Sequence, residues 1–174
     1  MRQFTITLAL CLCTLTLACK RPDPIRLQPT IEEPAALASM IQISDPSTST
    51  QLIRGFYQLE QQVWRWTAPR FTVALQVPLQ ARKNGAWLVL KFDVPEVSIS
   101  TLKRMTVNAK LGNTVLDPET IATAGAHEYR REVPASAFTK EVMDADFTVD
   151  RFLTSAADDR QLSLIVLAIG LESK

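Results

Sequence analysis

Apolar and polar side chains alternate along much of the chain. The alternation is clearest from Phe71 to Val77, and it returns over residues 87–94, 105–111 and 143–149. A period of two turns successive side chains of an extended strand to opposite faces, so that one face can be buried and the other solvated. Such a chain is expected to build its core from half-buried strands.

Other segments fit the same reading. Residues 39–43, 51–57, 63–68 and 127–133 are predicted strands, and the apolar run over 161–171 is rich in β-branched residues, which favours a central strand. Pro69-Arg70 is expected to separate two strands, and Asn84-Gly85 to form a hairpin turn. Eight to ten short strands without an amphipathic helix indicate an all-β fold, an antiparallel β-sandwich of jelly-roll type.

Two aromatic segments open this pattern, Gly55-Phe56-Tyr57-Gln58-Leu59-Glu60 and Trp64-Arg65-Trp66-Thr67. Trp64 and Trp66 share one strand face, and that face is expected to continue into the apolar stripe of the next strand. Indole rings are favourable to bury, so core packing is preferred for both over a sugar-stacking platform. Arg131 falls on the same face as apolar neighbours, which predicts a bulge or a strand end.

The first 18 residues have the features of a signal peptide. A basic start at Arg2 precedes an apolar run of 15 residues, Phe4 to Ala18, shorter than the ~20 residues of a membrane-spanning helix. Residues 15–19, Leu-Thr-Leu-Ala-Cys, resemble the bacterial lipobox, with Thr16 where leucine is usual. Cys19 is therefore expected to be the acylated mature N-terminus, carrying palmitate-type chains, and the alternative is plain cleavage after Ala18.

A proline-rich linker is expected over residues 19–36, since four of the ten prolines lie between positions 20 and 36. The β-sandwich domain then covers 37–174. Without residues 1–18 the chain has 18 basic and 18 acidic side chains. This balance gives no basic footprint for nucleic acid, and acyl chains alone would hold the protein at a membrane.

Three residues near the Asn84-Gly85 turn are the best ligand-binding candidates: Trp87, Lys91 and Asp93. They share the polar face of their strand, where an aromatic ring can meet a ligand, with packing at a strand edge as the alternative. A second polar set has a predicted structural role through charge-assisted hydrogen bonds; it comprises Glu60, Arg65, Asp158 and Arg160.

No catalytic or metal site is predicted, and no cofactor is expected. Asp144, Asp146 and Asp150 share a strand face, but no glycine-containing loop surrounds them as in a calcium site, and a solvated sheet face is favoured. His127 is the single histidine, too few for a zinc site, and no Gly-x-Ser-x-Gly elbow is present. Paired carboxylates for glycoside hydrolysis stay open, because any two acids can meet in space.

Residues 50–172 resemble small bacterial jelly-roll domains. The resemblance is carried by the Gly55–Glu60 and Trp64–Thr67 segments, by Asp158-x-Arg160-x-Leu162, and by Ile169-x-Leu171. Domains of this kind are carbohydrate-binding-like in shape. They accompany glycosyltransferases of surface-glycan synthesis and also occur as free-standing lipoproteins, and this chain has no accompanying catalytic domain.

The residues and the resemblance together predict an envelope lipoprotein on the periplasmic or cell-surface side of a bacterial membrane. Its expected function is non-enzymatic binding of glycan or of an envelope protein partner. The alternatives are a structural or assembly subunit of an envelope complex and, less favoured, a small glycoside hydrolase.

Overall fold

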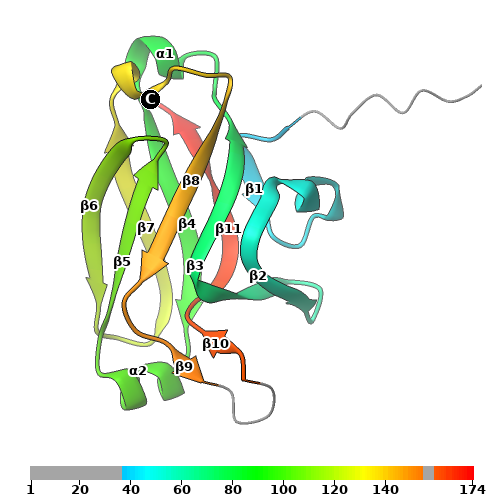
Figure 1. Cartoon of the computed structure of the whole chain (residues 1–174), viewed down its shortest axis with the longest axis vertical. Coiled ribbons are helices and arrows are strands. Elements are labelled where there is room, and N and C mark those ends of the chain that lie inside the picture. Colours follow the sequence, from blue (N-terminus) through cyan, green and yellow to red (C-terminus); the bar gives the residue numbers. More distant parts are fainter. Residues whose placement is uncertain (1–36, 155–158) are drawn as a thin grey trace, which may run out of the picture. The chain divides into compact units, whose positions relative to one another are not determined.

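Strands dominate the part of the chain that the structure describes, residues 37–154 and 159–174 of a computed structural model (Figure 1). The strands run in the order β1 (Met40–Gln42), β2 (Leu52–Glu60), β3 (Trp64–Gln76), β4 (Ala86–Val94), β5 (Met105–Leu111), β6 (Thr114–Ile121), β7 (Gly125–Val133), β8 (Val142–Val149), β9 (Leu153–Thr154), β10 (Gln161–Leu162) and β11 (Ile165–Ser173). Four short helices connect them: η1 (Pro46–Gln51), α1 (Ala81–Asn84), α2 (Glu96–Leu102) and η2 (Ala135–Ala137). The all-β prediction is confirmed.

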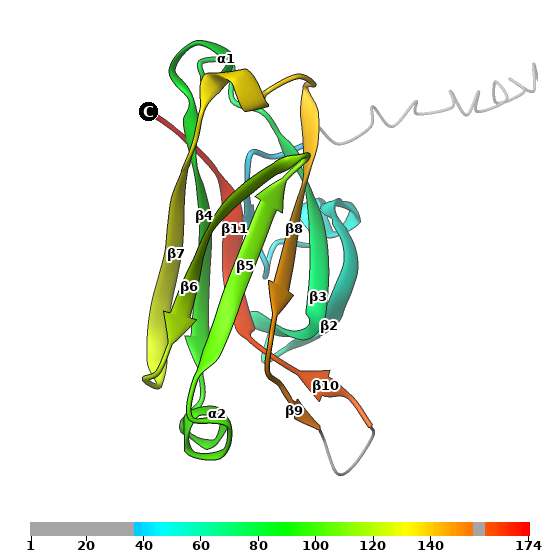
Figure 2. The same ribbon diagram turned by 60° about the vertical axis from the view of Figure 1, so that its left-hand side comes forward.

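The long strands form one antiparallel path, β6-β5-β8-β3-β11-β4-β7, folded into two layers (Figure 2). β3 carries the path from one layer to the other. Its first residues pair with β11, whereas residues 70–76 pair with β8. β2 adds to β3, and β1 adds to β11. The predicted central position of the C-terminal strand is confirmed, because β11 lies between β3 and β4.

The core lies between the two layers and follows the alternation read from the sequence. Phe71, Phe147 and Tyr129 are buried, and the Phe147 ring stacks on Phe71 at 5.0 Å and meets Tyr129 edge-on at 6.2 Å. The inward residues of β4, β5 and β8 complete it: Leu88, Leu90, Phe92, Val94, Met105, Val107, Ala109, Leu111, Met143, Ala145 and Val149. The strands of the two layers therefore hold one continuous apolar interior.

The prediction that Trp64 and Trp66 are sealed in the core is wrong. Both rings are half-buried and lie outside the core, whereas Thr67, the next residue of β3, is fully buried. The expected interruption at Pro69-Arg70 is absent, since β3 continues through both residues. Thr67 and Phe71 therefore face inward together, and the two indoles project to the outer side.

Gly55 fixes the crossing of β2 over the bend of β3. Its φ is +78°, and a Cβ there would lie 2.1 Å from the carbonyl oxygen of Arg70 and 2.7 Å from the Cα of Phe71. No side chain fits such an approach, and glycine adopts positive φ without steric cost. Close backbone contact at Gly55 thus fixes how the aromatic segment of β2 packs against β3.

The hairpin predicted at Asn84-Gly85 is also wrong. Residues 81–84 form α1, and Gly85 ends it with a φ of 78° and an N–H bonded to the carbonyl of Ala81. Positive φ at glycine suits a helix C-cap as well as a hairpin turn, so the dipeptide alone could not separate the two. β4 consequently pairs with β7 and β11 instead of with β3.

Arg131 has a different explanation from the predicted bulge. β7 pairs with β4 residue by residue without a shift. The Arg131 guanidinium reaches from β7 to β6, where it donates to the carbonyls of Asp117 and Pro118 and pairs with Glu119 at 3.1 Å. It therefore links two edge strands that no backbone ladder joins, and Pro118 suits such an edge because it has no N–H to donate.

The predicted signal peptide (residues 1–18) and the predicted linker (residues 19–36, with Cys19) lie outside the described residues, as does Asp158. In the part that the structure describes, no helix has the length and apolar character needed to span a membrane.

Candidate functional site: the outer face around Trp87

The outward side chains of β4 lie in the middle of the β7-β4-β11 layer. Trp87, Lys91 and Asp93 all belong to this set, as their alternation predicted, because the inward set is Leu88, Leu90, Phe92 and Val94. We call this surface the Trp87 face and define it by the outward residues Trp87, Lys91, Asp93, Glu128, Arg130, Glu132, Glu172 and Lys174.

Trp87 is half-buried, and two cations stand at its ring. The Arg130 guanidinium carbon is 5.0 Å from the ring centroid, and the Lys174 ammonium nitrogen is 5.2 Å from it. Cations at this distance are attracted by the negative face of the indole, with about 0.5–1 kcal/mol at exposed sites. The ring therefore has a defined position between these two cations.

The charges of the Trp87 face pair with one another across strands. Arg130 contacts Glu172 on β11 and lies 3.8 Å from Glu128, and Glu128 lies 3.9 Å from Lys91 on β4. Register explains the pairs: Lys91 is opposite Glu128.

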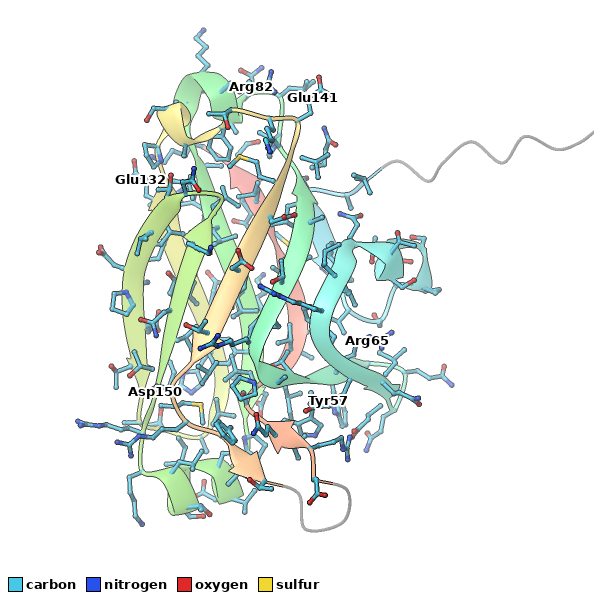
Figure 3. The ribbon with its side chains drawn as sticks, viewed as in Figure 1. Tyr57, Arg65, Arg82, Glu132, Glu141 and Asp150 are labelled. Atoms are coloured by element: carbon cyan, nitrogen blue, oxygen red, sulfur yellow. The ribbon has the colours of Figure 1, made fainter. Side chains whose placement is uncertain are left out.

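A further pair joins Lys174 to Glu132, which projects from β7 (Figure 3). Exposed pairs such as these contribute little to stability, about 0–1 kcal/mol each. Their effect is to hold donors and acceptors in fixed positions around the indole.

The residues beside Trp87 on this face have small side chains. Val89, between Trp87 and Lys91, is fully buried although it points outward. Opposite it on β11 stands Gly170, where a Cβ would lie 2.7 Å from the sulfur of Met40. Ala168 follows, opposite Lys91. Val89, Ala168 and Gly170 are all buried, so the ring of Trp87 and the charged side chains form the accessible surface here.

An open hollow of about 360 Å³ adjoins the lower part of the face. It is lined by Lys91, Phe92, Ala126, His127, Glu128 and Leu167. His127 is held by a 2.9 Å hydrogen bond between Nε2 and the carbonyl of Thr123, and its ring stacks on Phe92. Asp93 stands next to this hollow, in register with Ala126.

The predicted structural polar cluster is partly assembled. Arg160 lies 3.4 Å from the carboxylate of Glu60, and its guanidinium carbon is 5.5 Å from the Tyr57 ring centroid. Arg65 points to the same corner (Figure 3) but donates to the carbonyl of Tyr57 at 2.9 Å. These contacts join the β2–β3 hairpin to β10, which agrees with a structural role.

No family model and no curated protein matches this chain. Two of the solved structures to which this chain is similar are the following. One is a carbohydrate-binding module described for specific mannan recognition, with 12% identity, a TM-score of 0.42, and coverage of 78% of this chain and 95% of the module. The other is an acetyl xylan esterase from the rumen bacterium Butyrivibrio proteoclasticus, with 12% identity and a TM-score of 0.40.

This chain covers 34% of the esterase chain, and the match covers 80% of this one.

Sequence reasoning did not find the partners of Trp87. Alternation along β7 puts Glu128, Arg130 and Glu132 on one face, and this signal was readable. The pairing of β7 and β11 with β4 was not, because register between distant strands depends on the folded topology.

Proposed function

We propose that this protein is a non-catalytic binding module of the bacterial cell envelope that takes up glycan on its Trp87 face. The observation that carries the proposal is the half-exposed Trp87 ring, set in the middle of a sheet among fixed donors and acceptors. An array on a rigid strand loses little conformational freedom when a ligand binds.

The chemistry of the face suits a sugar ring. The C–H surface of a sugar can lie on the indole where Lys174 now stands, since that side chain can move aside. Arg130 and Lys91 offer N–H donors, and Glu128 and Glu172 offer carboxylate acceptors, so hydroxyl groups of either direction find partners. The hollow beside Lys91 gives room for a second sugar unit.

The carboxylates opposite Trp87 are engaged in ion pairs, which favours a binding role over hydrolysis. Glu132 and Glu172, the acids opposite Trp87 on the two neighbouring strands, pair with Lys174 and Arg130 respectively. Their oxygens serve an ion-pair network, whereas a glycosidase needs one carboxylic acid free to protonate the leaving group. A hydrolase screen with Glu60→Gln as a control tests the remaining acid of the polar cluster, and turnover lost in that variant would contradict a purely binding role.

Export and anchoring complete the proposal and rest on the sequence. Cys19 would carry the acyl chains, and the linker would hold the domain away from the membrane. Detergent phase partition tests the anchor: wild type is expected in the detergent phase and Cys19→Ser in the aqueous phase. Identical partition of the two proteins would remove lipidation.

A glycan array tests the binding function. The full chain, held in detergent micelles, is expected to bind at least one class of neutral oligosaccharide, and Trp87→Ala is expected to lose that signal. An array without any signal would remove the carbohydrate function and leave the envelope protein partner as the ligand class.

A further inference from the structure

The other layer of the sandwich carries two parallel rows of polar side chains on its outer side. The first row crosses four strands in register: Arg54, Thr72, Asp146 and Lys110. The second lies beside it, two residues along each strand, and consists of Arg70, Thr148 and Asn108. We call this surface the Asp146 face, and the two rows the bonded row and the open row.

The bonded row is satisfied internally. Asp146 accepts from Thr72 at 2.6 Å and from Arg54 at 3.1 Å, and its other oxygen lies 3.4 Å from Lys110. Burial acts to raise the pKa of Asp146, but the hydrogen bonds from Thr72, Lys110 and Arg54 and the charge of Lys110 outweigh it and lower that pKa. One carboxylate thus serves two cations, and the row keeps a positive excess.

The open row has no such bonds. Arg70, Thr148 and Asn108 are all exposed, and no side-chain hydrogen bond or ion pair joins any of them to another residue that the structure describes. Strands lie about 4.8 Å apart, so the three side chains form a line of roughly 10 Å across β3, β8 and β5. They present a guanidinium fork, a hydroxyl and an amide to solvent.

Two hollows meet at this row. One of about 160 Å³ lies toward Lys110 and Val115, and one of about 370 Å³ lies toward Arg70, Asp150 and Phe152. Asn108 and Thr148 line both, so the two hollows adjoin along the open row, and we call the pair the groove. Val115 is 79% exposed at one end, which gives the groove an apolar margin.

The charges along the groove favour an anion at Arg70. Of the two carboxylates that line it, Asp146 is shared by Arg54 and Lys110, and Asp150 accepts from the backbone N–H of Thr106 at 2.6 Å. Asp144 follows on β8 but lines neither of these two hollows. Arg70 makes no ion pair with any residue that the structure describes, and a guanidinium fork matches a carboxylate in a bidentate manner.

We propose that the open row is a second binding site, for a saccharide that carries carboxylate groups. The carboxylate binds Arg70, and hydroxyl groups of the same or the next sugar unit bind Thr148 and Asn108. The site stands on its own contacts and does not depend on glycan binding at the Trp87 face.

Calorimetric titration of the full chain in detergent micelles with hexagalacturonate tests the site, with the methyl ester of that oligomer as the uncharged counterpart. The acid form is expected to bind and the ester to bind far more weakly. Arg70→Gln should weaken binding by at least about tenfold, because it removes a charged hydrogen-bonded pair. Arg70→Lys should restore part of the affinity, since lysine keeps the charge but lacks the fork.

Two controls separate this site from others. Arg82→Gln removes an exposed arginine from α1, at the end of the domain away from Asp150 (Figure 3), and Trp87→Ala removes the other proposed site; neither should change the affinity. Absence of binding, equal binding of acid and ester, or full affinity in Arg70→Gln would overturn the proposal. Displacement by inorganic phosphate at equal concentration would overturn it too, in favour of a bare anion site.

Discussion

The Trp87 face and the Asp146 face cover opposite sides of one core, and they differ in how their polar groups are satisfied. Around Trp87, Lys91, Arg130 and Lys174 each already have a carboxylate partner. On the Asp146 face, one row is bonded internally, whereas the side chains of the neighbouring row, headed by Arg70, have no such partners among the described residues. An aromatic ring marks the first face, and the exposed guanidinium of Arg70 marks the second.

The difference separates two kinds of recognition. The three cations of the Trp87 face all pair with carboxylates, and Asp93 adds a further acid, so the face has no excess of cations. A neutral ligand there gains mainly from the indole and from oriented hydrogen bonds. Arg70 makes no ion pair among the described residues, and it attracts an anion over a distance that salt shortens. Binding at the Asp146 face is therefore expected to weaken with added salt more than binding at the Trp87 face.

The largest expected effect comes from Gly55, which sets β2 against β3 beside Arg70. Gly55→Ala would force a Cβ against the Arg70 carbonyl, and a loss of more than about 3 kcal/mol in the free energy of unfolding is expected. Gly125→Ala is the matched control, because Gly125 also has positive φ (101°) but no atom within 4 Å of an added Cβ. Urea unfolding measures both, and equal losses would show that close backbone contact is not what fixes the Asp146 face.

The next largest effect is expected from the Trp87 ring, on the affinity for neutral glycan. Trp87→Ala is expected to weaken binding of the neutral glycan by at least about tenfold, since aromatic anchors dominate small interfaces. Trp87→Phe should keep part of the affinity, and Arg70→Gln should keep all of it. Calorimetry measures the affinity of the three variants. A greater loss of affinity in Arg70→Gln than in Trp87→Ala would contradict binding of the neutral glycan at the Trp87 face.

Because of Asp146, the bonded row is expected to make an acid-sensitive contribution to the free energy of unfolding. Asp146→Asn should lower the free energy of unfolding at pH 7 by about 1–2 kcal/mol, because charged hydrogen bonds from three partners are weakened. The folded-state pKa lies below the ordinary 3.8, so this stabilisation is complete above that value and is lost as the pH falls through the folded pKa.

Urea unfolding of Asp146→Asn and wild type between pH 2 and pH 7 measures this contribution (about 1.4 kcal/mol per pKa unit). Asp144→Asn is the matched control, since Asp144 is exposed on the same strand and makes no ion pair with any residue that the structure describes. A difference between wild type and Asp146→Asn that persists at low pH would contradict the assignment.

The smallest effect tests whether Lys174 covers the ring. Lys174→Ala should change stability by less than about 0.5 kcal/mol and should raise affinity for the neutral glycan by up to about fivefold, the equivalent of one exposed cation–π contact. Lys140→Ala, an exposed lysine on the loop before β8, should change neither. A weaker affinity in Lys174→Ala would instead make Lys174 a ligand contact.

The alternating pattern predicted most of the fold, because period-two burial is a local property. It placed Phe71, Phe147 and Leu90 inward and Trp87, Lys91 and Asp93 outward. It failed at Trp64 and Trp66, where a break at Pro69-Arg70 was assumed and the strand instead bends without changing faces. It failed at Gly85, since positive φ serves a helix cap and a hairpin equally.

The sequence could predict which residues of the candidate site share one strand, but not which strands come together. Trp87, Lys91 and Asp93 lie on one strand, and their shared face follows from the sequence. Arg130 and Lys174 come from β7 and from the end of the chain after β11, and the open row joins Arg70, Thr148 and Asn108 from three strands. Which strands are neighbours, and in which register, depends on the whole sandwich, so no local pattern reveals those contacts.

Nuclear magnetic resonance titration of the labelled full chain with the neutral oligosaccharide identified on the array tests the central claim most directly. Shifts are expected at the indole N–H of Trp87 and at the amides of β4 and β7 around Lys91 and Glu128, with Arg70 and Thr148 unchanged. Shifts confined to β3, β8 and β5, or a Trp87 indole signal that does not move at saturation, would contradict it.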